Sequence, residues 1–413
     1  MTPEVRDRID QIRQGIVPEG YKKTKSGILP ESWSVRTIAE CLERVEHPVE
    51  VQANEMYTQI GIRSHGKGLF YKEPVTGDSL GNKSVFWIEP DCFILNIVFA
   101  WEQAVGKTTQ AEAGMIGSHR FPMYRPINGS IDIDYLISYL LTKRGTDILE
   151  AASPGGAGRN RTLGQDRFMK SRIVLPPLDE QKKIAEILST QDKAIELQER
   201  KIEELKRFKK GCLEKMFPRK GQKVPETRFP GFTDDWEQRK LSDLAEKTYG
   251  GGTPTTSNEA YWNGDIPWIQ SSDVVDGKLL GVEPRKWITQ GGLNNSAAQL
   301  IPENSIAIIT RVGVGKLAFM PYSYATSQDF LSLSKLNVEP FFAVYACYKK
   351  LQSELNAVQG TSIKGITKDE LLAKSIMVPR YAEQQQIGAF FKQLDKLITL
   401  HQRKLDEMKK QKK

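Results

Sequence analysis

The chain has 413 residues, 39% hydrophobic and 27% charged, which is ordinary for a globular protein. Its 59 Lys and Arg residues exceed its 51 Asp and Glu residues, and the formal net charge of +8 favours an anionic partner, most commonly nucleic acid. Four widely spaced cysteines exclude a disulfide framework and fit the reducing cytoplasm, and no apolar run approaches the roughly 20 residues that cross a membrane.

Residues 1–20 predict an N-terminal helical segment. Ile9, Ile12 and Ile16 recur at helical spacing within the charged stretch from Arg6 to Val17.

Residues 21–175 predict a first globule of mixed helix and sheet. The apolar run Cys92–Phe99 is typical of a strand, and Asp134–Glu150 has a helical pattern. Its Gly-rich loops carry basic and amide side chains, which in other proteins read guanine and adenine or hold phosphates. Taken alone each is more often a solvated loop residue, so the prediction of DNA contact rests on the set: Arg63, His65, Lys67, Lys107, Arg120, Arg159, Asn160 and Arg161.

Residues 176–220 predict a long central helix. Pro176 and Pro177 disfavour helix before it, and Glu180–Phe217 contains no Pro and a single Gly. Apolar residues alternate at spacings of four and three, an a/d seam interrupted by a polar Gln198. About 38 helical residues would span roughly 57 Å.

Residues 221–378 predict a second α+β globule, with strands at Ile306–Thr310 and Phe330–Leu336 and a helix at Phe341–Ala357. Its loops supply the second set of candidate DNA-contacting residues: Gln270, Ser271, Arg311, Lys316, Gln328 and Lys364. Residues 379–413 then predict a second long helix, whose seam is interrupted by His401.

A constant shift of 203 residues relates the two halves. It carries Trp33 to Trp236, Glu180 to Glu383 and Asp192 to Asp395, which indicates a tandem duplication. Two matching seams predict that the long helices pair as an antiparallel coiled coil; the alternative is two separate surface helices. The predicted seam residues are Ile184, Leu188, Ile195, Ile202, Leu205, Ile387, Phe391, Leu394, Ile398 and Leu405. Because the second copy stops short, the N-terminal segment is expected to complete its helix, with the two chain ends meeting.

Motifs for catalysis are hard to find. Gly106-Lys107-Thr108 lacks the first glycine of a phosphate-binding loop, and Lys316 is followed by Leu317 in place of Ser or Thr. These two Gly-flanked lysines, at comparable places in the halves, either lie in plain hairpin turns or meet DNA phosphates. No HExxH, GxSxG or methyltransferase motif is visible, so we expect a binding chain that holds no metal and no cofactor.

These motifs resemble the specificity subunit of type I restriction-modification systems. The resemblance rests on Leu175-Pro176-Pro177-Leu178 with Glu180-Gln181, on its weaker copy at Val378-Pro379 with Glu383-Gln384, and on entry motifs around Trp33 and Trp236. The second copy departs from the pattern at Arg380-Tyr381 and Gly388, which puts only local packing in doubt.

The resemblance implies an α+β fold in which two target-recognition domains are separated by two long helices that form an antiparallel coiled coil with pseudo-twofold symmetry. It implies a non-catalytic subunit that recognises a bipartite site in double-stranded DNA. Two modification (methyltransferase) subunits would join it, and two restriction (motor-nuclease) subunits can follow. S-adenosylmethionine, ATP and Mg are expected on those partners.

Two other functions stay open at this point. A self-contained methyltransferase or endonuclease would transfer methyl groups or cut DNA without partners. A structural adaptor would use the coiled coil only to join proteins and would not select DNA sequences.

Overall fold

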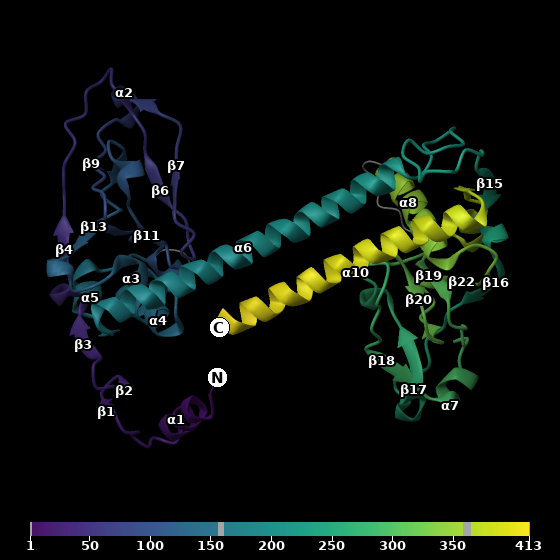
Figure 1. Ribbon diagram of the computed structural model, residues 1–413, viewed down its shortest axis with the longest axis horizontal. Coiled ribbons are helices and arrows are strands. Elements are labelled where there is room, and N and C mark those ends of the chain that lie inside the picture. The colour runs from purple at the N-terminus through teal and green to yellow at the C-terminus, as the bar shows by residue number, and fades with distance from the viewer. Residues whose placement is uncertain (1, 156–160, 358–364, 413) are drawn as a thin grey trace. The chain divides into compact units, whose positions relative to one another are not determined.

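The chain divides into two compact units, Met1–Lys193 and Ala194–Lys413, and the computed structural model describes residues 2–155, 161–357 and 365–412 (Figure 1). The boundary falls inside helix α6 (Leu178–Lys215), which begins in the first unit and ends in the second. In the part of the chain that the structure describes, no helix is both long and apolar enough to cross a membrane.

The first unit opens with helix α1 and alternates short strands with turns. Its elements are α1 (Pro3–Arg13), β1 (Tyr21–Thr24), β2 (Gly27–Pro30), β3 (Ser34–Thr37), η1 (Ile38–Glu40), β4 (Leu42–Val45), β5 (Met56–Tyr57), β6 (Ile60–Ile62), β7 (Leu69–Tyr71), β8 (Val75–Thr76), α2 (Gly77–Leu80), β9 (Val85–Trp87), β10 (Phe93–Leu95), η2 (Ala100–Glu102), β11 (Val105–Lys107), β12 (Ile116–Ser118), β13 (Met123–Pro126), α3 (Ile133–Leu140), α4 (Lys143–Ala152), α5 (Gln165–Lys170) and β14 (Arg172–Leu175).

The second unit holds the end of α6, a globule and the C-terminal helix. Its elements are β15 (Glu237–Lys240), η5 (Leu241–Leu244), β16 (Ala245–Gly250), β17 (Trp262–Ile269), η7 (Ser271–Asp273), β18 (Lys286–Ile288), α7 (Gln290–Asn294), β19 (Ser305–Ile309), β20 (Leu317–Met320), β21 (Ala325–Thr326), β22 (Phe330–Leu336), α8 (Pro340–Ala357), α9 (Lys368–Leu372), β23 (Ser375–Val378) and α10 (Tyr381–Lys412).

Both globules are built on one frame. The four-stranded sheet of the first has the order β11-β10-β13-β4, and that of the second has the order β20-β19-β22-β16, which is the same sequence of equivalent strands. A closing ladder repeats with an identical register. Arg172 pairs with Thr37 in the first globule and Ser375 with Lys240 in the second, and both residues of the second pair lie one repeat length after those of the first. The duplication predicted from the sequence is therefore present in the backbone pairing.

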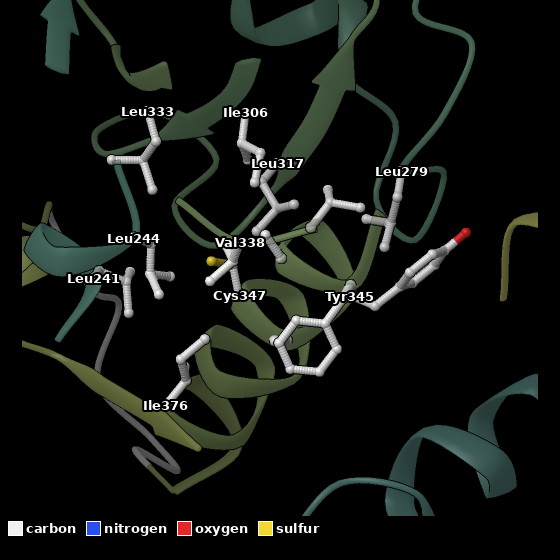
Figure 2. Close-up of a cluster of buried hydrophobic side chains, with 14 of the residues drawn as sticks. Leu241, Leu244, Leu279, Ile306, Leu317, Leu333, Val338, Tyr345, Cys347 and Ile376 are labelled. Carbon is white, nitrogen blue, oxygen red and sulfur yellow. The ribbon is translucent and has the colours of Figure 1, made fainter. Parts of the chain in front are cut away.

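The core of the second globule lies between this sheet and helix α8. Figure 2 shows Ile306, Leu317 and Leu333 from the sheet meeting Val338 and Cys347 near or on the helix. All are almost fully buried, and burial of this kind contributes about 1.5–3 kcal/mol per large apolar side chain. The first globule has the corresponding core between its sheet and helices α3, α4 and α5.

A buried glutamine fastens the start of each long helix to its own globule. Gln181 donates to the Pro176 carbonyl at 2.9 Å and accepts from the backbone N–H of Asp132, the N-cap of α3, at 2.9 Å. Gln384 repeats both bonds at 2.8 Å, to the Pro379 carbonyl and from the Glu339 N–H that precedes α8. The Glu-Gln pair that opens each helix is thus a structural tie.

Within the second unit, α10 runs antiparallel to the end of α6. Gln198 lies beside His401, and Lys209 bonds Asp395, so contacts move backward along α10 as they move forward along α6. The Gln198 amide nitrogen lies 2.8 Å from His401 Nδ1 and donates to its carbonyl oxygen at 2.8 Å. These two residues are separated by the repeat length of 203, and a residue that touches its own repeat equivalent marks a local twofold axis. The predicted antiparallel pairing is confirmed for this stretch.

One predicted helix needs correction. The expected helix Asp134–Glu150 is broken into α3 and α4, because the Thr142 hydroxyl accepts from Gly145 N–H and starts a new helix there. Gly145 also packs so closely on the preceding turn that a Cβ would lie 2.2 Å from the Tyr139 carbonyl oxygen. The first long helix, Leu178–Lys215, lies within the predicted residues 176–220.

Candidate nucleic-acid interface

In the first globule, the segment from Asn96 to Ala104 gathers several candidate loops. The turn between β6 and β7 is tied to it, since the backbone N–H of His65 donates to the Glu102 carbonyl at 2.8 Å. His65 itself has a left-handed backbone with φ of 62°, and Lys67 lies exposed in the same turn. Arg63 is exposed and lies over the Phe70 ring, 5.2 Å from its centroid.

Two further candidate arginines meet the same segment. Arg161 lies over the Trp101 ring at 5.3 Å from its centroid. The exposed Arg120 accepts through its carbonyl oxygen from Ile97 N–H, whose own carbonyl accepts from Leu163 N–H. The structure therefore brings the predicted residues Arg63, His65, Lys67, Arg120 and Arg161 around one segment. Arg159 and Asn160 lie outside the described residues.

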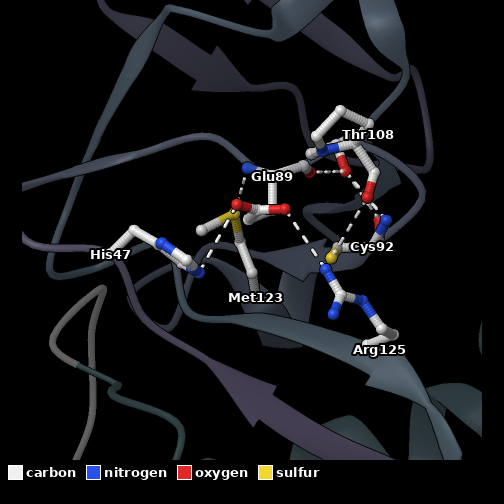
Figure 3. A network of polar contacts seen from close by, with 7 residues as sticks. His47, Glu89, Cys92, Thr108, Met123 and Arg125 are labelled. Atoms are coloured by element: carbon white, nitrogen blue, oxygen red, sulfur yellow. Dashed lines mark hydrogen bonds and ion pairs between the residues drawn. The ribbon is translucent and has the colours of Figure 1, made fainter.

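A polar network fastens the loops of this globule to its sheet. Figure 3 shows the Glu89 carboxylate between His47, 3.4 Å away, and Arg125, 3.2 Å away. The fully buried Thr108 hydroxyl donates to the Glu89 carbonyl at 2.6 Å and accepts from Cys92 N–H at 2.9 Å. These bonds join the ends of β4, β9 and β13, so we interpret the network as structural.

The position of Lys107 differs from the one that we expected. It is the last residue of β11, not part of a turn, and its ammonium pairs with the Asp134 carboxylate at 2.8 Å. Partial burial by itself lowers the pKa of Lys107, but Asp134 outweighs it and the pKa is raised. Lys316, in contrast, follows the tip of the β19–β20 turn. The two lysines are therefore not equivalent in the frame, and Lys107 already has an anionic partner.

In the second globule, two parallel strands bring candidate residues to one edge. β17 and β21 pair in parallel, so Gln270, which follows β17, and Gln328, which follows β21, leave the sheet at the same end. Ser327 N–H donates to the Ile269 carbonyl at 3.0 Å, which fixes the two loops together. Ser271 opens the short helix η7 beside them.

The hairpin β19–β20 reaches the same edge. Thr310 N–H donates to the Asp329 carbonyl at 2.7 Å, which places the exposed Arg311 next to the Gln328 loop. The Thr310 carbonyl accepts from Ile366 N–H, and Lys364 lies outside the described residues. Gln270, Ser271, Arg311 and Gln328 are therefore collected along one edge, and Lys316 ends the same β19–β20 turn that carries Arg311.

Sequence reasoning missed a basic and aromatic group beside this edge. Lys286 on β18 lies over the rings of Trp262 and Trp268, at 5.6 and 5.9 Å from their centroids. Its neighbour Arg285 is 3.5 Å from the buried carboxylate of Asp273. The available signal was the run Arg285-Lys286-Trp287, in which two basic residues precede an aromatic one, close in sequence to the tryptophans of β17.

Nine of the ten predicted seam residues fall into two groups. Ile202, Leu205 and Leu405 are buried where α6 and α10 run together, and Ile195 and Ile398 are half-buried there. Ile387, Phe391 and Leu394 pack with the core of the second globule, and Ile184 packs against the core of the first. Leu188 is half-buried on α6. The beginning of each seam is therefore a helix-to-globule contact, which a heptad pattern alone does not distinguish from helix pairing.

The described ranges contain neither a candidate metal site nor a cysteine activated as a nucleophile. No group of three His, Cys, Asp or Glu side chains in them could hold a metal ion. Burial raises the pKa of each cysteine thiol, that of Cys347 to about 12, so the thiols stay protonated near neutral pH.

The comparison with known proteins agrees with this architecture. The family described as "Type I restriction modification DNA specificity domain" matches residues 85–207 and 233–410, one stretch in each half of the chain. The MjaX specificity subunit of Methanocaldococcus jannaschii, a type I restriction enzyme component, is 24% identical over 96% of this chain and 94% of its own length. The EcoR124I/EcoR124II specificity subunit of Escherichia coli is 31% identical over 40% of this chain and 41% of its own.

A solved structure supports the fold. The crystal structure of the S subunit of a type I restriction-modification system from M. genitalium matches with a TM-score of 0.56 at 12% identity, covering 92% of this chain and 94% of that one. The family match spans well over half of the chain, which settles the assignment to this family. Membership of the family removes the alternative of a self-contained enzyme. The chain belongs to the specificity subunits of type I restriction-modification systems.

Proposed function

We propose that the chain recognises a bipartite sequence in double-stranded DNA, with one half-site read by each globule. The observation that carries the proposal is the repeated frame, in which the same sheet order and closing ladder hold two different sets of loops. One frame with unlike loops suits one task performed on two unlike sequences. The loop edges carry Arg, Gln and Ser side chains, which suit base edges and phosphates.

The long helices supply the second half of the proposal. Two readers that are joined through fixed elements select half-sites at a set spacing, as dimeric repressors do. Helix α6 has 38 residues and would rise about 57 Å if straight. The polar Gln198–His401 contact within the seam favours one alignment of α6 with α10, because other alignments would bury these groups without partners.

Catalysis would then belong to partner subunits that this chain directs to the DNA. We propose two modification subunits, which would bring S-adenosylmethionine, and two restriction subunits, which would bring ATP and Mg. The repeat supports the number two for the modification subunits. Leu197 on α6 and its repeat equivalent Leu400 on α10 are 58% and 50% exposed, so each helix presents the same uncovered leucine. The place of this activity is expected to be the cytoplasm.

Co-expression with the modification subunit, followed by mapping of methylated bases across the host genome, tests the proposal. A split motif with two specific parts and a constant gap is the expected result. Methylation that is confined to one continuous motif would rule out the two-reader arrangement. Complete absence of sequence-selective binding by the assembled complex would favour the adaptor alternative.

The partner number has its own test by native mass spectrometry of the purified complex. We expect two modification subunits per chain, and we expect Leu197→Lys and Leu400→Lys each to weaken one of the two. Leu300→Lys is the control, because Leu300 is also exposed, at 47%, but lies in the globule. Equal loss in all three variants would argue against a duplicated docking face.

A further inference from the structure

The carboxylate of Asp273 is buried in an unusual way. Its side chain has no exposed surface, and one oxygen accepts from Gln270 N–H at 3.0 Å. The other oxygen, Oδ1, is buried without a hydrogen bond in the described structure. A buried carboxylate oxygen without a hydrogen bond is costly, so the cation that lies nearest to it becomes important.

Arg285 is the cation that faces this oxygen. Its Nε lies 3.5 Å from Asp273 Oδ1, which is an ion-pair distance but too long for a good hydrogen bond. The Arg285 side chain is nevertheless 68% exposed. Nε is the guanidinium nitrogen nearest to the carboxylate, and the exposure of the side chain leaves the guanidinium able to donate to another molecule.

The surroundings indicate what that molecule is. Asp273 ends the short helix η7 that begins just after Gln270, so Arg285 is held beside the edge that carries Gln270, Ser271 and Gln328. Next to it, Lys286 lies over two tryptophan rings. Figure 1 shows β17 and β18 at the end of this globule that lies away from α10. An exposed guanidinium fork beside amide side chains matches a base edge with two adjacent acceptors.

We propose that Arg285 reads a guanine through the major groove in the half-site of the second globule, and that Asp273 is the positioning residue that aims it. The inference rests on the proposed function and names one of its base-reading side chains. Asp273 fixes the orientation through Nε and leaves Nη1 and Nη2 for the O6 and N7 acceptors of the base. A lysine would carry the charge but not the fork.

The test uses the chain in complex with its modification subunits and compares methylation motifs and duplex affinities. For Arg285→Ala we expect ~10- to 100-fold weaker binding to the native site and a relaxed preference at one G·C position of one half-site. The other half-site should keep its preference. Arg285→Lys should not restore the preference, and Asp273→Asn should relax the same position to a lesser degree.

Arg239→Ala is the matched control, since Arg239 is a half-buried arginine paired with Glu237 at 2.8 Å on β15 of the frame. It should leave affinity and motif unchanged. An unchanged motif in Arg285→Ala, or full rescue by Arg285→Lys, would overturn the proposal. If the wild-type complex itself methylates no split motif, the failure belongs to the proposed function and not to the role of Arg285.

Discussion

Removal of the Gln384 side chain tests the tie between helix α10 and its globule. Gln384 is 4% exposed, and its substitution by Ala would leave two buried backbone groups, the Pro379 carbonyl and the Glu339 N–H, without their partners. Each group left unsatisfied costs about 1–3 kcal/mol, and some relief by entering water is expected. We therefore expect a loss of about 2–4 kcal/mol in the stability of the second unit.

Hydrogen exchange read by mass spectrometry resolves this loss by unit. At about 1.4 kcal/mol per tenfold change, core amides of α8 and β22 should exchange roughly 30- to 700-fold faster in Gln384→Ala. Core amides of the first globule should be unaffected. Gln181→Ala should instead speed exchange in the core of the first globule and leave the second unaffected, because Gln181 makes the equivalent bonds to Pro176 and Asp132.

Gln385→Ala is the control within the same helical turn. Gln385 is exposed, so its loss should change stability by no more than about 0.5 kcal/mol. If the core amides of Gln384→Ala exchange as slowly as those of Gln385→Ala, the two hydrogen bonds of Gln384 do not hold the start of α10. Faster exchange in both units after a single substitution would show instead that the two ties do not act separately.

Three further predictions follow from contacts of the frame and the helices. Arg228→Ala should destabilise the second unit by about 3–5 kcal/mol in chemical denaturation. The reason is that the buried Glu383 carboxylate, to which Arg228 donates at 2.7 and 2.8 Å, would lose its cationic partner. Arg228→Lys should recover part of the lost stability. Insertion of one heptad into both α6 and α10 adds about 10 Å of helix and should lengthen the preferred spacer by roughly three base pairs in methylation maps, whereas an unchanged spacer would refute the measuring role. Burial alone raises the pKa of Glu354, but its bonds to Lys374 and Lys350 outweigh burial and lower the pKa below the usual 4.5. The stabilisation from these bonds is present above pH 4.5 and is lost as the pH falls through that value and then through the lower folded pKa. Thermal melts of Glu354→Gln should therefore depend less on acid pH than those of the native chain.

The long helices and the repeat could be predicted because their signals are periodic or duplicated. A seam of alternating spacing and a shift of 203 residues need no knowledge of the globules. The polar interruptions Gln198 and His401 were visible too, and the structure brings them into contact. Only their meaning as a local twofold axis required coordinates.

The candidate interface was less predictable, because its residues are brought together by pairings without a local signal. The strand β17 contains Asn263, Gly264 and Pro267, which are typical of turns, yet it pairs with β18 across a register shift. Its parallel partner β21 has two residues. The ion pair of Lys107 with Asp134 joins residues 27 positions apart, which no motif indicates.

Differences between the two copies show which parts of the frame are fixed. Glu180 accepts from the indole N–H of Trp33 at 3.0 Å, whereas Glu383, its repeat equivalent, accepts from the Arg228 guanidinium. The indole N–H of Trp236, equivalent to Trp33, is consequently buried without a partner in the described structure. The carboxylate at the helix start therefore tolerates a change of donor, while both bonds of the neighbouring glutamine are kept. The fixed ties set how each helix leaves its globule, and that exit is what a spacing between half-sites would depend on. The loop edges lie outside these ties, so under the proposed function a change in their side chains would alter the sequence that is read without moving the helices.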